Sequence, residues 1–164
     1  MFLVTLINEG GDIMFGKNLK YLLQSIRKEL EVSGKKLVLV GRQGWGKDHE
    51  LNLLLNEMKA SILFTEYIPL NVMQSLYHYA YAFTLLSIEE GFGRTPLEAI
   101  ACGCKHIIVS DIPVFHETLD GSATYIPLNK KEEAENLFLS HQWIEVKDNF
   151  KVPFDAIEHS IDFI

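Results

Sequence analysis

The chain has 164 residues, of which 48% are hydrophobic, and its 15 basic and 22 acidic side chains give a formal net charge of −7. This length and this apolar fraction fit one compact domain with a real core, and they exclude intrinsic disorder. The acidic balance argues against a nucleic-acid partner, because proteins that bind nucleic acids carry basic surfaces. The sequence shows no apolar run long enough to span a membrane and no recognisable signal peptide, so we expect neither.

Short apolar runs alternate with helical patterns along the chain. Continuous apolar runs of this length are typical of strands that are buried on both faces of a sheet. Six such strands are predicted, at residues 2–7, 37–40, 62–64, 81–86, 106–109 and 123–126.

Apolar residues between the predicted strands recur with helical spacing. They form four stripes, made of Leu19, Leu22, Leu23, Ile26 and Leu30; of Leu51, Leu54, Leu55 and Met58; of Leu70, Met73, Leu76 and Tyr77; and of Leu97, Ile100 and Ala101. Alternation of strands and helices with short connectors predicts an α/β fold, a Rossmann-like, doubly wound parallel sheet of about six strands with helices on both faces. Glycines follow three of the strands, at the edge where such folds bind ligands: 10–11, 44–46 and 91–93.

The pattern weakens after Asn129. Residues 130–164 hold four basic and eight acidic side chains, and therefore supply −4 of the net charge of −7. We interpret residues 1–129 as the sheet domain and residues 130–164 as a solvated helix and irregular tail of the same domain. A dedicated partner-binding segment is the alternative for this tail.

The segment from Ser87 to Val109, SIEEGFGRTPLEAIACGCKHIIV, combines several features of a ligand site. A Gly-Phe-Gly turn follows a strand and precedes a helix that opens at about residues 95–96. The glycines let backbone amides approach a ligand, and the start of the helix offers N–H groups to an anion. Glu90 and Glu98 suit the hydroxyl groups of a sugar or ribose, because carboxylates accept hydrogen bonds. The alternative is a plain turn in which Glu89 and Glu90 are acidic surface residues.

The same residues resemble the E-x7-E signature of retaining family-4 glycosyltransferases with the GT-B fold, usually seen as EGFG-x-x-x-LEA-x-ACG. Here the signature reads EGFGRTPLEAIACG from Glu90 to Gly103. Four further stretches resemble the family in order and spacing over residues 2–128: GKNL (16–19), LVLVGRQGW (37–45), FTEYIP (64–69) and SDIPVFHE (110–117).

The resemblance implies a role for each matched position. Glu90 and Lys17 are the implied catalytic residues: Glu90 contacts hydroxyl groups of the donor sugar, and Lys17 neutralises the departing diphosphate. Glu98 binds the nucleotide ribose. The other donor-binding positions act mainly through backbone groups, with amides for the diphosphate or sugar and contacts to the base: Gly91, Phe92, Gly93, Arg94, Thr95, Tyr67 and Ile68.

The chain departs from the family pattern at several of these places. Gly16 stands where an arginine commonly provides a second cation, and Glu66 stands where glycine is frequent near the base. Arg94 replaces an apolar residue, and we hypothesise that it supplies the lost cation from the opposite side. Residues 105–106 replace a usual Pro-Val, and the first loop, residues 8–15, is longer than typical and carries two acidic side chains.

The resemblance also implies what the whole enzyme does. A GT-B enzyme has two Rossmann-like domains, and this chain resembles only the one that binds the nucleotide-sugar. The implied reaction transfers a hexose of the mannose, glucose or galactose type from a UDP- or GDP-sugar to a glycan or lipid-linked acceptor. It retains the anomeric configuration and uses no metal or other cofactor.

The chain is about half of what this chemistry needs, and we expect donor binding but little transfer without an N-terminal acceptor domain, which could be a separate chain. An excised domain, a split enzyme and a degenerate remnant stay open. The alternative functions are a non-catalytic nucleotide-sugar-binding module and a sugar-nucleotide epimerase of the GT-B type.

Other motifs point to no further chemistry. Cys102 and Cys104 are too close together to staple a fold, and they indicate a reducing compartment. The localisation we expect is therefore cytoplasmic, where a partner could hold the protein at the inner face of the membrane. Together with His106, these cysteines do not match the spacing of zinc ligands. Nicotinamide and Walker A fingerprints are absent, and Ser87, Ser110 and His116 form no nucleophile elbow.

Overall fold

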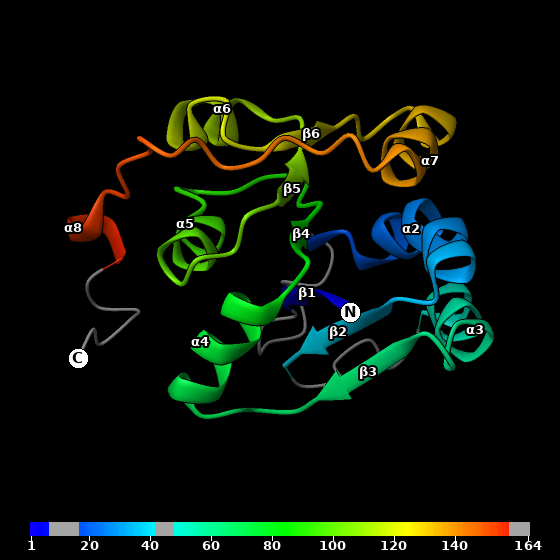
Figure 1. Cartoon of the computed structure of the whole chain (residues 1–164). Helices are drawn as coiled ribbons and strands as arrows, with labels where there is room; N and C mark the ends of the chain where they lie inside the picture. Colours follow the sequence, from blue (N-terminus) through cyan, green and yellow to red (C-terminus); the bar gives the residue numbers. More distant parts are fainter. Residues whose placement is uncertain (7–16, 42–47, 158–164) are drawn as a thin grey trace.

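A parallel six-stranded sheet forms the centre of the molecule (Figure 1). The computed structural model describes residues 1–6, 17–41 and 48–157. The strands are β1 (Phe2–Leu6), β2 (Lys36–Val40), β3 (Ile62–Thr65), β4 (Ala82–Leu85), β5 (Ile107–Ser110) and β6 (Thr124–Ile126). Their order is β3-β2-β1-β4-β5-β6, with every neighbouring pair parallel. This order is that of a Rossmann-like sheet, so the prediction is confirmed, and the direction of winding reverses between β1 and β4.

Helices cover both faces of this sheet, as predicted. They are α2 (Leu19–Ser33), α3 (His49–Glu57), α4 (Leu70–Tyr79), α5 (Arg94–Ala101), α6 (Pro113–Leu119), α7 (Lys131–Ser140) and α8 (Phe154–Ile157). Figure 1 shows α2, α3 and α7 on one face and α4, α5, α6 and α8 on the other. None of the helices in the described ranges has both the length and the apolar character that crossing a bilayer requires.

Successive residues of a strand pack into different layers of the hydrophobic core, one on each face of the sheet. Leu3 packs with α2, α3 and α7, whereas its neighbour Val4 packs with α4, α5 and α6. The adjacent strand repeats this division, because Leu37 pairs with Leu3 in register and Val38 pairs with Val4. Side chains alternate between the faces of a strand, and both faces are covered here, so the strands read as continuous apolar runs.

The predicted helical stripes meet the sheet with one exception. All five apolar residues of the α2 stripe are buried, and the helix ends at Gly34, which has φ 68° and donates its N–H to the carbonyl of Leu30. Leu70 was predicted to lie on the buried stripe of α4, and this is wrong, because its side chain is 39% exposed. Leu70 is the first residue of α4, at the end of the helix away from the buried Tyr77.

The C-terminal part of the chain is less solvated than its charge suggests. α7 packs against α2, and Phe138 is fully buried between them and the sheet. Trp143 joins this same layer of core, and Ile157 joins the layer on the opposite face of the sheet. The orange segment in Figure 1 shows how residues 141–153 pass from one face to the other. The predicted helix and irregular tail are present and most of their side chains are exposed, but Ala134, Phe138, Trp143 and Ile157 are buried in the core.

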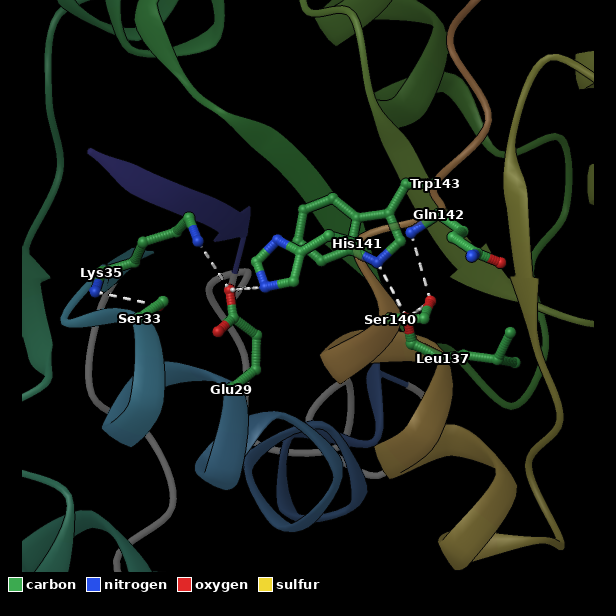
Figure 2. Close-up of polar contacts among 8 residues, drawn as sticks. All are labelled: Glu29, Ser33, Lys35, Leu137, Ser140, His141, Gln142 and Trp143. Atoms are coloured by element: carbon green, nitrogen blue, oxygen red, sulfur yellow. Dashed lines mark hydrogen bonds and ion pairs between the residues drawn. The ribbon is translucent and has the colours of Figure 1, made fainter.

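A group of charged and aromatic side chains surrounds the buried Glu29 at the amino ends of the strands (Figure 2). We call Glu29, Lys35, Tyr81, His141 and Trp143 the amino-edge cluster. One carboxylate oxygen of Glu29 accepts a hydrogen bond from Lys35 Nζ at 2.9 Å and lies 3.6 Å from His141 Nε2. The ammonium group of Lys35 lies 4.9 Å from the centre of the Tyr81 ring, and His141 stacks on Trp143. Aromatic rings therefore shield the charges from water.

Candidate functional site

The two predicted catalytic residues meet at the carboxyl edge of the sheet, where the strands have their carboxyl ends. Lys17 follows β1 in the chain and Glu90 follows β4, so both come after the carboxyl ends of the two strands where the winding reverses. Their side chains form an ion pair in which the lysine is 13% exposed and the glutamate 15% exposed. Ligands of doubly wound sheets bind in this position, outside the carboxyl ends of the strands at the reversal. The pair therefore lies where a ligand is expected and remains accessible to it.

The loop after Glu90 needs a glycine at Gly93. This residue has φ 73° and begins α5 as its N-cap, and a Cβ atom there would lie 2.7 Å from Cε1 of the buried Phe115. A side chain would thus meet both a left-handed backbone and an aromatic ring. At Gly91 a Cβ atom would meet nothing within 4 Å, and Phe92 is 43% exposed. The loop is therefore pinned at its end and open at its tip.

The start of α5 is suited to an anion. Arg94 and Thr95 occupy the first two positions of the helix, where backbone N–H groups have no partner within the helix. Pro96 comes third, where its missing N–H leaves no donor unpaired. The side chain of Arg94 is exposed. Two backbone donors, the helix dipole and a nearby cation thus act in the same place.

Glu98 has different neighbours from Glu90. It is the fifth residue of α5 and is half-buried. Burial raises the pKa of Tyr77 and of Cys102, and the negative charge of Glu98 raises both further. Glu98 therefore lies on the side of α5 that faces α4, whereas Glu90 is held by Lys17 beside the reversal point.

The residues predicted to meet a base lie farther along the same edge. Tyr67 and Ile68 follow β3, which is separated from β1 by β2. The ring of Tyr67 is 78% exposed, and Ile68 packs partly into the core beneath α4 and α5. The structure thus puts these two residues on the predicted edge but not in contact with the Lys17–Glu90 pair. Gly16, residues 8–15 and residues 44–46, which the sequence also singled out, lie outside the described residues.

Two serines behind Glu90 were missed as site residues. Ser87 and Ser110 are both 0% exposed. The hydroxyl of Ser87 donates to Oε1 of Glu90 at 2.7 Å, and the hydroxyl of Ser110 donates to the carbonyl of Ser87 at 2.6 Å. A polar residue placed directly after a fully buried strand is the sequence signal that could have identified both.

The cysteines near this segment are not poised for chemistry. Both thiols are free, and burial raises the pKa of Cys104 to about 11. Burial also raises the pKa of Cys102. Both thiols are therefore neutral near pH 7 and poor nucleophiles. In the described ranges, no three His, Cys, Asp or Glu side chains gather in a way that could hold a metal ion.

Comparison with known proteins connects this geometry to one family. The family model "Glycosyl transferases group 1" matches residues 11–141. The O-antigen chain mannosyltransferase RfbU of Salmonella typhimurium is 38% identical over 90 residues, which are 55% of this chain and 25% of that protein. The match thus spans a quarter of the length of this relative.

Solved structures share the fold at low sequence identity. The pneumococcal O-GlcNAc transferase GtfA, in complex with UDP and GlcNAc, has a TM-score of 0.64 at 22% identity over 85% of this chain and 27% of that chain. HepE of Anabaena, in complex with UDP and glucose, has a TM-score of 0.64 at 14% identity over 85% of this chain and 38% of that chain. TarM of S. aureus has a TM-score of 0.67 at 13% identity over 85% of this chain and 28% of that chain. These structures establish one half of a GT-B fold for this chain.

Proposed function

The chain belongs to the group 1 glycosyl transferases, and on this premise we propose that it is the donor-binding domain of a hexosyltransferase that uses a UDP- or GDP-sugar. The observation that carries this proposal is the Lys17–Glu90 ion pair across the reversal point of the sheet, next to the start of α5. A cation, a carboxylate and unpaired amides together match the parts of a nucleotide-sugar: a diphosphate and a polyol.

The proposed binding mode assigns the diphosphate to the cationic and amide groups. Lys17 and the N–H groups of Arg94 and Thr95 hold its oxygens, and the open tip at Gly91 and Phe92 lets the ligand approach the backbone. Glu90 accepts hydrogen bonds from hydroxyl groups of the sugar. Two further contacts complete the ligand in this proposal, from Glu98 to the ribose and from the loop at Tyr67 and Ile68 to the base.

The proposed chemistry is transfer with retention of the anomeric configuration, without a metal, as in family-4 enzymes with an E-x7-E signature. As the bond between sugar and phosphate breaks, negative charge grows on the diphosphate. Lys17 and the oriented amides of α5 stabilise that charge, and donors arranged in advance in a closed site lower a barrier by roughly 3 kcal/mol each. Glu90 holds the sugar while its bond to the leaving group lengthens.

The proposal includes a second domain for the acceptor. The chain covers 25% of the mannosyltransferase relative and 27% of GtfA, and the surface around Gly91 and Phe92 is open. We propose that a glycan or lipid-linked acceptor binds to an additional domain, in the same polypeptide or in a separate chain. Closure of that domain over the donor excludes water and permits transfer, and the described part alone binds the donor with little turnover. The cytoplasm, which holds nucleotide-sugars, is the proposed location.

Calorimetry with UDP, GDP, UDP-glucose, UDP-GlcNAc and GDP-mannose tests the proposal. We expect one base to be preferred, and Lys17→Met to weaken binding of the diphosphate of that base at least about tenfold, because a charge-assisted contact is lost. Lys20→Met is the matched control, since Lys20 lies on the next turn and pairs with the exposed Glu50.

Three results would count against the proposal. If no nucleotide or nucleotide-sugar binds, the donor site is wrong and the chain is a degenerate member of its family. If Lys17→Met and Lys20→Met weaken binding equally, the effect is one of general charge and the pair is not the site. Binding without transfer in the presence of an acceptor domain would indicate the non-catalytic binding module.

A further inference from the structure

A serine hydroxyl in the protein interior, which ligand and solvent cannot reach, donates a hydrogen bond to the carboxylate of Glu90. Ser87 is 0% exposed, and its hydroxyl donates to Oε1 of Glu90 at 2.7 Å. In the described part of the chain, the recorded contacts of this carboxylate all go to Oε1, from Ser87 and from Lys17. The second oxygen, Oε2, therefore has no partner among the described residues, and a carboxylate oxygen can accept a hydrogen bond.

The two partners of Oε1 differ in how easily a ligand can draw them away from Glu90. Lys17 is partly exposed and is the cation that an incoming diphosphate attracts. Ser87 follows the fully buried β4 by two residues, and its own carbonyl accepts a hydrogen bond at 2.6 Å from the buried hydroxyl of Ser110 at the end of β5. When Lys17 turns to a diphosphate, the serine contact remains and the carboxylate keeps its direction.

We propose that Ser87 is a positioning residue for recognition of the donor sugar, and that Ser110 supports it. The buried hydroxyl fixes one oxygen of Glu90 so that the other is presented to a sugar hydroxyl. This role rests on the proposed function, because it concerns the same donor site. It predicts that the serine affects the sugar part of the ligand and leaves the nucleotide part unaffected.

The measured quantity is the sugar gain, the ratio of the Kd of a nucleoside diphosphate to the Kd of its nucleotide-sugar. Calorimetry gives this ratio for the wild type with UDP, GDP, UDP-glucose, UDP-GlcNAc and GDP-mannose. We expect Ser87→Ala to lower the sugar gain about tenfold, the size of effect for a hydrogen bond to a charged group. The affinity for the diphosphate alone should stay within about twofold. Ser110→Ala acts one hydrogen bond farther from Glu90 and should lower the sugar gain about two- to threefold.

Two further variants separate positioning from packing. Ser87→Cys keeps the shape of the side chain with a somewhat larger atom, but a thiol is a weak donor, so we expect it to lose most of the sugar gain. Ser122→Ala is the matched control, because Ser122 is also buried and hydrogen-bonded, through the N–H of Lys147, but lies at the opposite edge of the sheet. Ser122→Ala should leave the sugar gain unchanged, while it lowers thermal stability about as much as Ser87→Ala does.

The outcomes distinguish this inference from the donor site itself. If the wild type binds neither nucleotides nor nucleotide-sugars, both proposals fail. If it binds both with equal affinity, the nucleotide site stands and the role of Ser87 is overturned. The role is also overturned if Ser87→Ala retains the sugar gain, if Ser87→Cys behaves like the wild type, or if diphosphate and nucleotide-sugar lose affinity equally.

Discussion

Each edge of the sheet carries a lysine paired with a glutamate, and the two pairs have opposite surroundings. At the carboxyl edge, Lys17 and Glu90 are 13% and 15% exposed and lie beside an open glycine loop. At the amino edge, Lys35 is 10% exposed and Glu29 is 0% exposed (Figure 2). The ammonium group of Lys35 lies over the ring of Tyr81, which packs against Trp143.

The difference shows how one kind of ion pair can serve two purposes. At the amino edge Glu29 is fully buried, and one of its carboxylate oxygens holds both Lys35 and His141, so the pair fastens α2 to the residues before β2 and after α7. The other oxygen, Oε2, has no hydrogen-bond partner among the described residues. The pair at the carboxyl edge has a partner that an anion can compete for, and a buried serine that it cannot displace. The two lysines are similarly shielded, so the exposure of the glutamate is what separates the structural contact from the candidate site.

The largest expected effect tests the ion pair of Lys35 and Glu29 at the amino edge. Lys35→Ala leaves the carboxylate of Glu29 buried without its cation, and we expect a loss of about 3–5 kcal/mol in the free energy of unfolding, measured by urea denaturation. Lys36→Ala is the control, because its side chain is exposed and reaches only the carbonyl of Ala60. A loss for Lys35→Ala no larger than for Lys36→Ala would contradict the role of the amino-edge cluster.

A second substitution tests the geometry of the open edge. Gly93→Ala combines a left-handed backbone with an approach of 2.7 Å to Phe115, and we expect a loss of about 2–4 kcal/mol in the free energy of unfolding. Gly91→Ala meets nothing within 4 Å and should cost at most about 0.5 kcal/mol. Equal losses for the two variants in urea denaturation would show that the loop is not pinned at Gly93.

The pH dependence of stability tests how well the amino edge excludes water. Burial raises the pKa of Cys104, just before β5, to about 11 from an ordinary 9.0. Between these values the unfolded chain releases the proton while the folded chain keeps it, so this contribution to stability is complete below pH 9 and falls as pH rises toward 11. The expected loss is about 2–3 kcal/mol.

Urea denaturation between about pH 8 and about pH 11 measures this loss. Cys104→Ala removes the contribution and should show a shallower fall than the wild type. Tyr77 and Cys102 also have raised pKa values, and both remain in that variant. Cys102→Ala is the control, and because its thiol is only half-buried its effect on the slope should be smaller. Identical slopes for the wild type and Cys104→Ala would indicate that water reaches this thiol.

The smallest expected effect on stability is at the candidate site itself. Lys17→Met breaks the ion pair with Glu90. Because water reaches Glu90, we expect a loss of only about 1 kcal/mol in the free energy of unfolding. Lys20→Met serves as the surface control. A loss as large as that of Lys35→Ala would remove the contrast between the two edges, and Lys17 would then be a structural residue.

Much of this architecture could be predicted from local patterns. All six strands lie within about two residues of their predicted bounds, and the α2 stripe is buried throughout. The start of α5 at Arg94 was placed within two residues, because a Gly-Phe-Gly turn followed by proline is a local signal. Prediction failed for Leu70, and it did not identify the buried Phe138 and Trp143 in the C-terminal part, because their burial depends on neighbours distant in the chain.

The sequence by itself determined the strands, the helices and the residue types at the carboxyl edge, because periodicity and turn chemistry are properties of neighbouring residues. Only the tertiary structure decided which of those residues touch. Lys17 and Glu90 are 73 positions apart and meet because β1 and β4 lie side by side. Ser110 reaches Ser87 across 23 positions because β4 and β5 are neighbours. Strand order results from the packing of the whole sheet, and no local pattern specifies it.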